Sequence, residues 1–228
     1  MRLLILLPLL CFFIQCTEEE PVDVELAPVS FPQSIQLKAP SSPHAPSRIT
    51  ASIATFNDFM KNAQLYLNTI SKIEPTVDGN DYVWAIQLQG KQITVTGTRQ
   101  QDDSIAWEVS LLDIGDQSEE QDPWVALQGT TTDNAGSSQE WLIFQENSTA
   151  IFVRMSITKS SDGLVSAAIE DVSLQLKQTV LNNVDDSGEY REFAGQVKMY
   201  EALWASDGSG HYTAWTEAGV FSDEGDWE

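Results

Sequence analysis

Side chains that commonly carry catalysis are scarce in this chain. Its 228 residues include two histidines, His44 and His211, and two cysteines. His44 lies in a proline-rich stretch, so a zinc site built on several histidines cannot form around His211 alone. A Ser–His–Asp triad would also have to use His211, yet no Gly-x-Ser-x-Gly nucleophile-elbow motif is present. We therefore expect that the protein is not an enzyme.

Acidic residues are abundant but form no recognisable metal loop. The chain has 34 Asp and Glu against 12 Lys and Arg, a formal charge of −22. Acidic clusters occur at residues 102–103, 113–122, 185–189 and 223–226. None has the spacing of an EF-hand, and solvated loops explain them better than calcium sites. We expect no metal and no cofactor. The charge also repels phosphate backbones, so we expect no nucleic-acid partner.

The segment 193–216 could form a binding surface of aromatic side chains. Asp207-Gly208 is a dipeptide that two-residue hairpin turns prefer. Such a turn would bring three aromatic rings and one imidazole to the same face of a hairpin: Tyr200, Trp204, His211 and Trp215. If that face points outward, it suits stacking on sugar rings or another flat neutral ligand. The alternative is that a helix or another sheet covers it.

The N-terminus has the pattern of an export signal. Arg2 precedes an apolar run over residues 3–14, which is about 18 Å of helix and too short to span a hydrocarbon core of about 30 Å. Cys16 follows in place of the small residues of an ordinary cleavage site. The segment resembles the lipobox of bacterial lipoproteins, although Gln15 stands where a small residue is usual. The resemblance implies a signal peptide over residues 1–15 and a lipid on Cys16.

An acidic run directly follows this cysteine. Thr17 is followed by Glu18, Glu19 and Glu20. This run resembles the surface-export signal of Bacteroidota lipoproteins, which implies a location on the outer membrane facing the cell exterior. The alternative is a solvated linker. With Cys11 in the signal peptide and Cys16 lipidated, the folded domain has no thiol, so disulfides and cysteine chemistry are excluded.

Residues 16–48 are rich in proline and poor in large apolar side chains. Six prolines lie between residues 21 and 46. This composition favours an extended, semi-rigid chain, so we expect the lipidated Cys16 and an acidic, proline-rich tether that holds the domain away from the membrane.

The domain itself, residues 49–228, begins with a helical pattern. Apolar residues recur at three- and four-residue steps over 49–73, the period of one helical face. Without a basic stripe, this helix is expected to pack on its own domain rather than on a membrane.

A period of two then predicts a succession of antiparallel strands. Strands are expected within residues 82–97, with a Gly90-Lys91 turn that sets Leu88 opposite Ile93, and within residues 105–114, 124–131, 140–146, 150–158, 164–180 with a break, 193–204 and 211–216. A turn at residues 147–149 would set Trp141 opposite Met155. The fold class is therefore mainly β: an antiparallel meander, either a barrel or an open half-barrel, preceded by one amphipathic α-helix. This order resembles the architecture of lipoprotein carriers and lipocalin-like domains.

These features predict an outer-membrane lipoprotein with a non-catalytic binding or structural role at the cell envelope. Its partners would be the membrane, through the lipid anchor, and a glycan, an apolar small molecule or another envelope protein. Two narrower functions stay open: a carbohydrate-binding accessory lipoprotein, and a carrier of lipid or another apolar ligand in an open barrel. An exposed aromatic strip would favour the first and a closed apolar cavity the second.

Overall fold

Apolar side chains at helical spacing form the buried face of α1 (Ser47–Ile70). This face lies in the core and consists of Ile49, Ile53, Phe56, Met60, Leu67 and Ile70. The computed structural model describes residues 29, 31–32, 35–88, 90–114, 122–132 and 137–228. The predicted signal peptide, Cys16 and the acidic residues 17–20 lie outside the described residues. The helix packs on its own domain, as its non-basic polar face predicted.

Thirteen strands follow α1 and form a single sheet. They are β1 (Thr76–Asp78), β2 (Asp81–Leu88), β3 (Lys91–Arg99), β4 (Ile105–Asp113), β5 (Trp124–Thr131), β6 (Ser138–Phe144), β7 (Ile151–Lys159), β8 (Val165–Asp171), β9 (Leu176–Asn182), β10 (Gly188–Ala194), β11 (Val197–Trp204), β12 (Gly210–Trp215) and β13 (Phe221–Trp227). Each strand pairs antiparallel with its neighbours in the chain, and β1 and β13 are the two edges. The predicted fold class, a mainly β meander behind one helix, is confirmed. The sheet is open.

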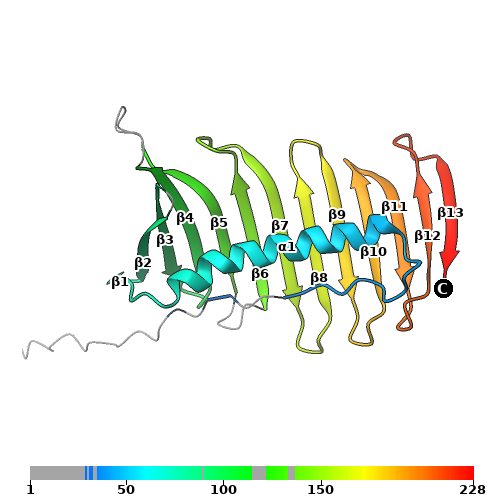
Figure 1. The fold of residues 1–228 in the computed structure, drawn as a ribbon, viewed down its shortest axis with the longest axis horizontal. Helices are drawn as coiled ribbons and strands as arrows, with labels where there is room; N and C mark the ends of the chain where they lie inside the picture. Colours follow the sequence, from blue (N-terminus) through cyan, green and yellow to red (C-terminus); the bar gives the residue numbers. More distant parts are fainter. Residues whose placement is uncertain (1–28, 30, 33–34, 89, 115–121, 133–136) are drawn as a thin grey trace, which may run out of the picture.

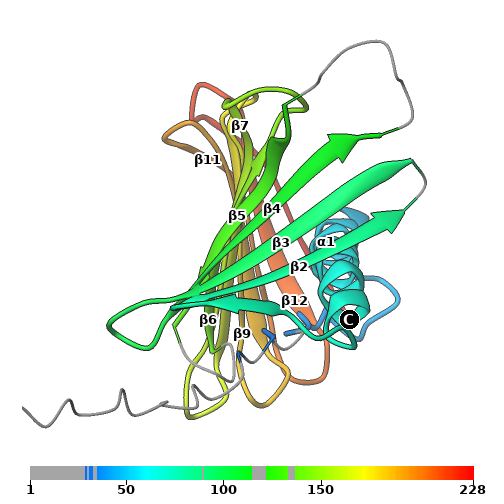
Figure 2. The ribbon, with the colours of Figure 1, turned by 90° about the vertical axis from the view of Figure 1, so that its left-hand side faces the viewer.

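The helix crosses the sheet on one face, which we call the inner face. In Figure 1, α1 runs across the strands from β10 and β11, near its first residue, to β2, near its last. Figure 2 shows the sheet twisting strongly and curling around α1, so that the helix fills part of the hollow. On the opposite face of the sheet, the outer face, no helix lies among the described residues.

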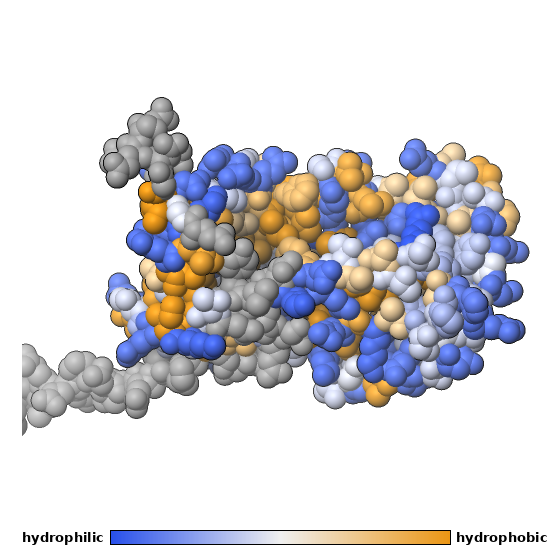
Figure 3. Space-filling view, viewed as in Figure 1, coloured by the Kyte–Doolittle hydropathy of each residue, from blue (hydrophilic) through white to orange (hydrophobic). Residues whose placement is uncertain are grey.

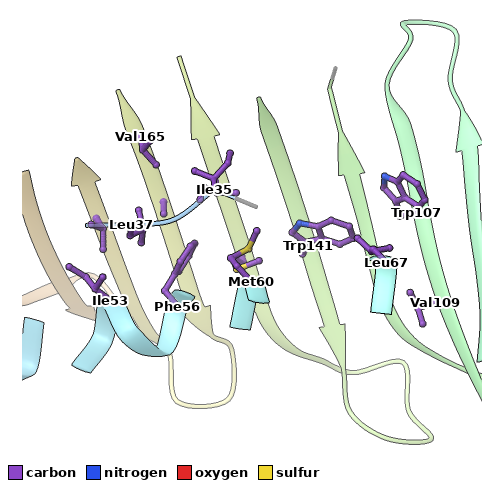
Figure 4. Packing of buried hydrophobic residues seen from close by; sticks show 14 of the residues in the cluster. Ile35, Leu37, Ile53, Phe56, Met60, Leu67, Trp107, Val109, Trp141 and Val165 are labelled. Atoms are coloured by element: carbon purple, nitrogen blue, oxygen red, sulfur yellow. The ribbon is translucent and has the colours of Figure 1, made fainter. Parts of the chain in front are cut away.

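Tryptophan and glycine alternate across strands on the inner face. One cross-strand row contains Gly97, Trp107, Gly129 and Trp141, and a second contains Gly188, Trp204, Gly210 and Trp227. A Cβ atom added to Gly129 would lie 2.1 Å from Trp141 Cε3, so the indole occupies the space that a side chain would need. These glycines let large rings lie flat against the sheet beneath α1. Figure 4 shows Trp141 beside Leu67 of the helix.

Residues 35–46, here called the strap, pack on the domain instead of extending from it. Ile35 and Leu37 are buried and point into the core beside Val165 and Phe56 (Figure 4). The Asn57 amide donates to the Leu37 carbonyl and accepts from the Leu37 N–H, both at 2.8 Å. The prediction of an extended tether is therefore wrong for residues 35–46. The two buried apolar side chains and the hydrogen-bonded backbone of Leu37 hold this segment on the domain.

Candidate functional site

The predicted aromatic face is not formed, because the hairpin that would carry it has a different register. Trp204 lies opposite Gly210 and not opposite His211, and Tyr200 lies opposite Ala214. The loop contains residues 205–209 rather than two residues. A shift of one residue moves a side chain to the other face of a sheet, so the four predicted residues divide between the two faces. The prediction that they share one surface is wrong.

Tyr200 and Trp204 lie on the inner face and belong to the core. Each is about 4% exposed. The Trp204 indole N–H donates to the Asp186 carbonyl at 3.1 Å. The Tyr200 ring stacks on Tyr212 with centroids 5.5 Å apart, and burial raises the pKa of Tyr200 to about 12. Both rings are therefore unavailable to a soluble ligand.

His211 and Trp215 lie on the outer face. His211 Nδ1 is 2.8 Å from Asp226 Oδ1, and its Nε2 is 3.4 Å from Thr213 Oγ1. This series resembles a nucleophile–base–acid arrangement, but the His211 and Asp226 side chains are 47% and 85% exposed. Catalysis by such a series relies on preorganised donors in water-excluded surroundings, which an open strand surface does not provide. Trp215 is covered in part by Lys198, whose Nζ lies 4.5 Å from the ring centroid.

A groove lies on the outer face of β3–β9. Its volume is about 640 Å³, within the range of small-ligand sites. Strand residues that flank Trp107 and Trp141 project away from α1 and line it. The lining side chains of this face are Thr96, Thr98, Ala106, Glu108, Gln128, Thr130, Glu140, Leu142, Arg154, Ser156, Ala168, Glu170 and Lys177.

Two cross-strand rows give the groove its regular floor. One row runs through Thr96, Glu108, Gln128, Leu142, Arg154, Glu170 and Lys177. The other runs through Thr98, Ala106, Thr130, Glu140, Ser156 and Ala168. Neighbouring strands lie about 4.8 Å apart, so each row presents a side chain at that interval, and all of these except Leu142 are polar or small.

Hydrogen bonds and an ion pair hold several groove side chains in place. The Gln128 amide donates to Glu108 Oε2 at 3.0 Å, and the Ser110 hydroxyl donates to Glu108 Oε1 at 3.3 Å. Arg154 Nη1 lies 3.5 Å from Glu170 Oε2. These contacts leave further lone pairs and N–H groups directed to solvent, where a ligand can reach them.

A partly buried polar cluster on the inner face joins α1 to the sheet. Arg48 makes a two-pronged ion pair with Glu192, with Nε 3.1 Å from Oε2. The Tyr190 hydroxyl donates to the same oxygen at 2.9 Å and lies 3.1 Å from Ser52 Oγ. Burial alone would raise the pKa of Glu192, but the hydrogen bonds from Arg48 and Tyr190 lower it. All four partners are occupied with one another, so this cluster fixes the helix rather than a ligand.

Apolar surface is visible on the side that carries α1. Figure 3 shows it above the helix, over the middle strands. Half-buried Leu111, Leu127 and Ile169 pack against the core on this side. This surface lies beside the helix that occupies the hollow of the sheet. An apolar carrier would need an enclosed cavity, and this arrangement provides an open surface instead.

Metal-ligating side chains are dispersed in the described part of the chain. No three of its His, Cys, Asp or Glu side chains lie close enough together to hold an ion. Within the same residues, no helix combines the length and hydrophobicity needed to cross a membrane.

Comparison with known proteins adds no family to this description. The chain matches no protein-family model, and no curated protein matches its sequence.

Proposed function

We propose that the protein is a lipid-anchored protein of the outer membrane, exposed at the cell surface, that binds a carbohydrate-class ligand in the outer-face groove without catalysis. The N-terminal pattern around Cys16 supports the anchor and the location. The groove supports the binding role. It replaces the aromatic face as the basis for a carbohydrate ligand, because Tyr200 and Trp204 are buried.

The observation that carries the binding role is the composition of the two groove rows. Carboxylates, an amide, a guanidinium and threonine hydroxyls together offer donors and acceptors at strand intervals, which suits a ligand with many hydroxyl groups. Leu142 and Ala168 add small apolar areas for the C–H faces of sugar rings. A ligand lying across the strands would meet these groups in turn.

Filling the groove should abolish binding. Ala168→Trp places an indole on the groove floor, whereas Thr213→Trp places the same ring on the outer face of β12, away from the groove. We expect Ala168→Trp to lose binding to an array of neutral and charged oligosaccharides and Thr213→Trp to keep it. Gln128→Ala removes a polar groove side chain without adding bulk and should weaken binding independently. If both groove variants fold and bind as the wild type does, the groove is not the site.

The lipid anchor is tested by Cys16→Ala. Acyl chains contribute about 0.8 kcal/mol per buried CH₂ and would be the only attachment proposed here. We expect the variant to leave the membrane fraction, while Cys11→Ala, a control in the same segment, stays in it. Retention of Cys16→Ala in the membrane would refute the anchor.

Surface exposure is tested by replacing Glu18, Glu19 and Glu20 with alanine. The variant should remain lipidated but face the periplasm, so that protease added to intact cells no longer cleaves it. Equal cleavage of variant and wild type would show that the acidic run is only a linker.

A further inference from the structure

Charge is unevenly distributed along the groove. Glu108 on β4 lies towards one end and Glu140 on β6 in the middle, whereas Arg154 on β7, Glu170 on β8 and Lys177 on β9 lie towards the other end. From β4 to β9 there are five strand intervals of about 4.8 Å, a span of about 24 Å. In a chain with formal charge −22, two basic side chains in a single groove are a local departure from the acidic surface.

The acidic end has no positive partner. Glu108 accepts hydrogen bonds from the neutral groups of Gln128 and Ser110. Glu140 is exposed on the neighbouring row. In the described residues no Lys or Arg lies within ion-pair distance of either carboxylate. This end therefore favours a cationic group on a ligand.

The basic end has more positive than negative charge. Arg154 pairs with Glu170 at 3.5 Å, and both side chains remain partly exposed. Lys177 is exposed opposite Glu170. Two cations thus surround one carboxylate, and a ligand anion could bind Lys177 and share the guanidinium of Arg154.

We infer that the groove takes a zwitterionic carbohydrate, with its amino groups against Glu108 and Glu140 and its acidic groups against Arg154 and Lys177. This inference rests on the proposed carbohydrate-binding function and specifies its ligand class and direction. A ligand with both charges matches each end of the groove, whereas a ligand with one charge matches one end and is repelled at the other.

Four hexasaccharides with the same sugar backbone and different charges test the inference. The parent alternates glucuronic acid with N-acetylglucosamine and is anionic. Removing the acetyl groups makes it zwitterionic, reducing the carboxyls makes it neutral, and both changes together make it cationic. We expect the zwitterionic form to bind at least about ten-fold more tightly than the other three in calorimetric titration, since charge-assisted hydrogen bonds account for a factor of this size.

Two pairs of variants then locate the charges. Glu108→Gln with Glu140→Gln should remove the preference for free amines and leave the preference for carboxyls. Arg154→Gln with Lys177→Gln should do the reverse. Glu224→Gln on β13 and Lys159→Gln at the end of β7 are controls outside the lining, and they should change neither preference.

The outcomes separate this inference from the proposed function. If the four forms bind equally and groove variants weaken all of them alike, the groove binds carbohydrate without discriminating by charge. The inference is then overturned. If none of these forms and no oligosaccharide of the array binds, the proposed function fails as well. Tightest binding of the zwitterion, lost stepwise in the two variant pairs, supports both.

Discussion

Trp204 and Trp215 belong to the adjacent strands β11 and β12 but have different surroundings. Trp204 lies over Gly188 in the core, and a Cβ at Gly188 would be 2.3 Å from its Cζ2. Trp215 lies half-buried on the outer face beneath Lys198. The same substitution should therefore have very different costs at the two positions.

Trp204→Ala should lower the free energy of unfolding by about 3–5 kcal/mol, because it removes a buried ring and leaves a cavity. Trp215→Ala should cost about 0.5–1 kcal/mol, the value of an exposed cation–π contact. Urea unfolding of the two variants measures both. Equal losses would mean that Trp215 is also part of the core.

Glu192 makes the stability of the domain depend on pH. Its pKa is lower in the folded protein than the ordinary value of 4.5, because the hydrogen bonds from Arg48 and Tyr190 outweigh the effect of burial. A depressed pKa contributes stability above the unfolded-state value, and this contribution is lost as the pH falls through the folded-state value. The relevant window therefore lies below about pH 5.

Glu192→Gln should lower the free energy of unfolding at pH 7 by about 1–3 kcal/mol, since it weakens charge-assisted hydrogen bonds. The difference from wild type should shrink as the pH is lowered to 3. Glu146→Gln, whose carboxylate is exposed and 3.7 Å from Lys91 Nζ, is the control. A difference that stays constant with pH would contradict the argument.

At the scale of the hairpins, loop length decided which predictions succeeded. The turn at residues 147–149 predicted Trp141 opposite Met155, and this register is confirmed. In the first hairpin Leu88 lies opposite Lys91 and not Ile93. That shift of two residues leaves every side chain on its predicted face. The shift of one residue at Trp204 moves the side chains of one strand to the opposite face.

The loop at residues 205–209 shows why the last register was wrong. Asp207 Oδ1 accepts hydrogen bonds from the Ser209 N–H at 2.9 Å and the Ser209 hydroxyl at 2.7 Å. Gly208 adopts the left-handed conformation, with φ +88°. An Asp-x-Ser sequence thus closes a five-residue loop, and the same bonds join Asp102 to Ser104 and Asp185 to Ser187. The Asp207-Gly208 dipeptide occurs in both kinds of loop, so it alone could not separate this five-residue loop from a two-residue turn.

The groove could not be found by reading the sequence along the chain. Its lining comes from seven strands, and each strand contributes one or two outer-face side chains of an ordinary alternating pattern. Only the registers of all the hairpins together bring Glu108, Arg154 and Lys177 into one row. Strands β1, β10 and β13 were also missed or merged with neighbours, because they are short or rich in charged residues.

Two asparagine side chains hold the strap by pairing with its backbone N–H and carbonyl groups, as a neighbouring strand would. Asn182 accepts from the Lys38 N–H at 2.8 Å and donates to the Lys38 carbonyl at 2.9 Å, as Asn57 does for Leu37. Asn182→Ala should leave both Lys38 backbone groups unpaired and accelerate amide hydrogen exchange across residues 35–46. Asn183→Ala, which removes only a bond to Ser187 Oγ, should not. Unchanged exchange in Asn182→Ala would show that apolar contacts alone hold the strap.

At the scale of the whole molecule, negative charge opposes folding. With a formal charge of −22, the compact state brings many carboxylates closer together than the unfolded chain does. Raising NaCl from about 0.02 M to about 0.5 M shortens the screening length several-fold. We expect the melting temperature to rise over this range, as measured by circular dichroism. A fall would mean that the screened ion pairs contribute more than the repulsion.

The course of α1 across the sheet has a consequence for the order of folding. Strand pairing in the meander is local, because each strand pairs with its chain neighbours and hairpins can form one after another. The start of the helix is different: Arg48 meets Glu192 across 144 residues of chain, and Ser52 meets Tyr190 across 138. The segment that is synthesised early therefore docks only after β10 has been made. Until then the apolar side of α1 has no partner over its first turns, and the nascent protein has to be shielded from aggregation at least until β10 has been made.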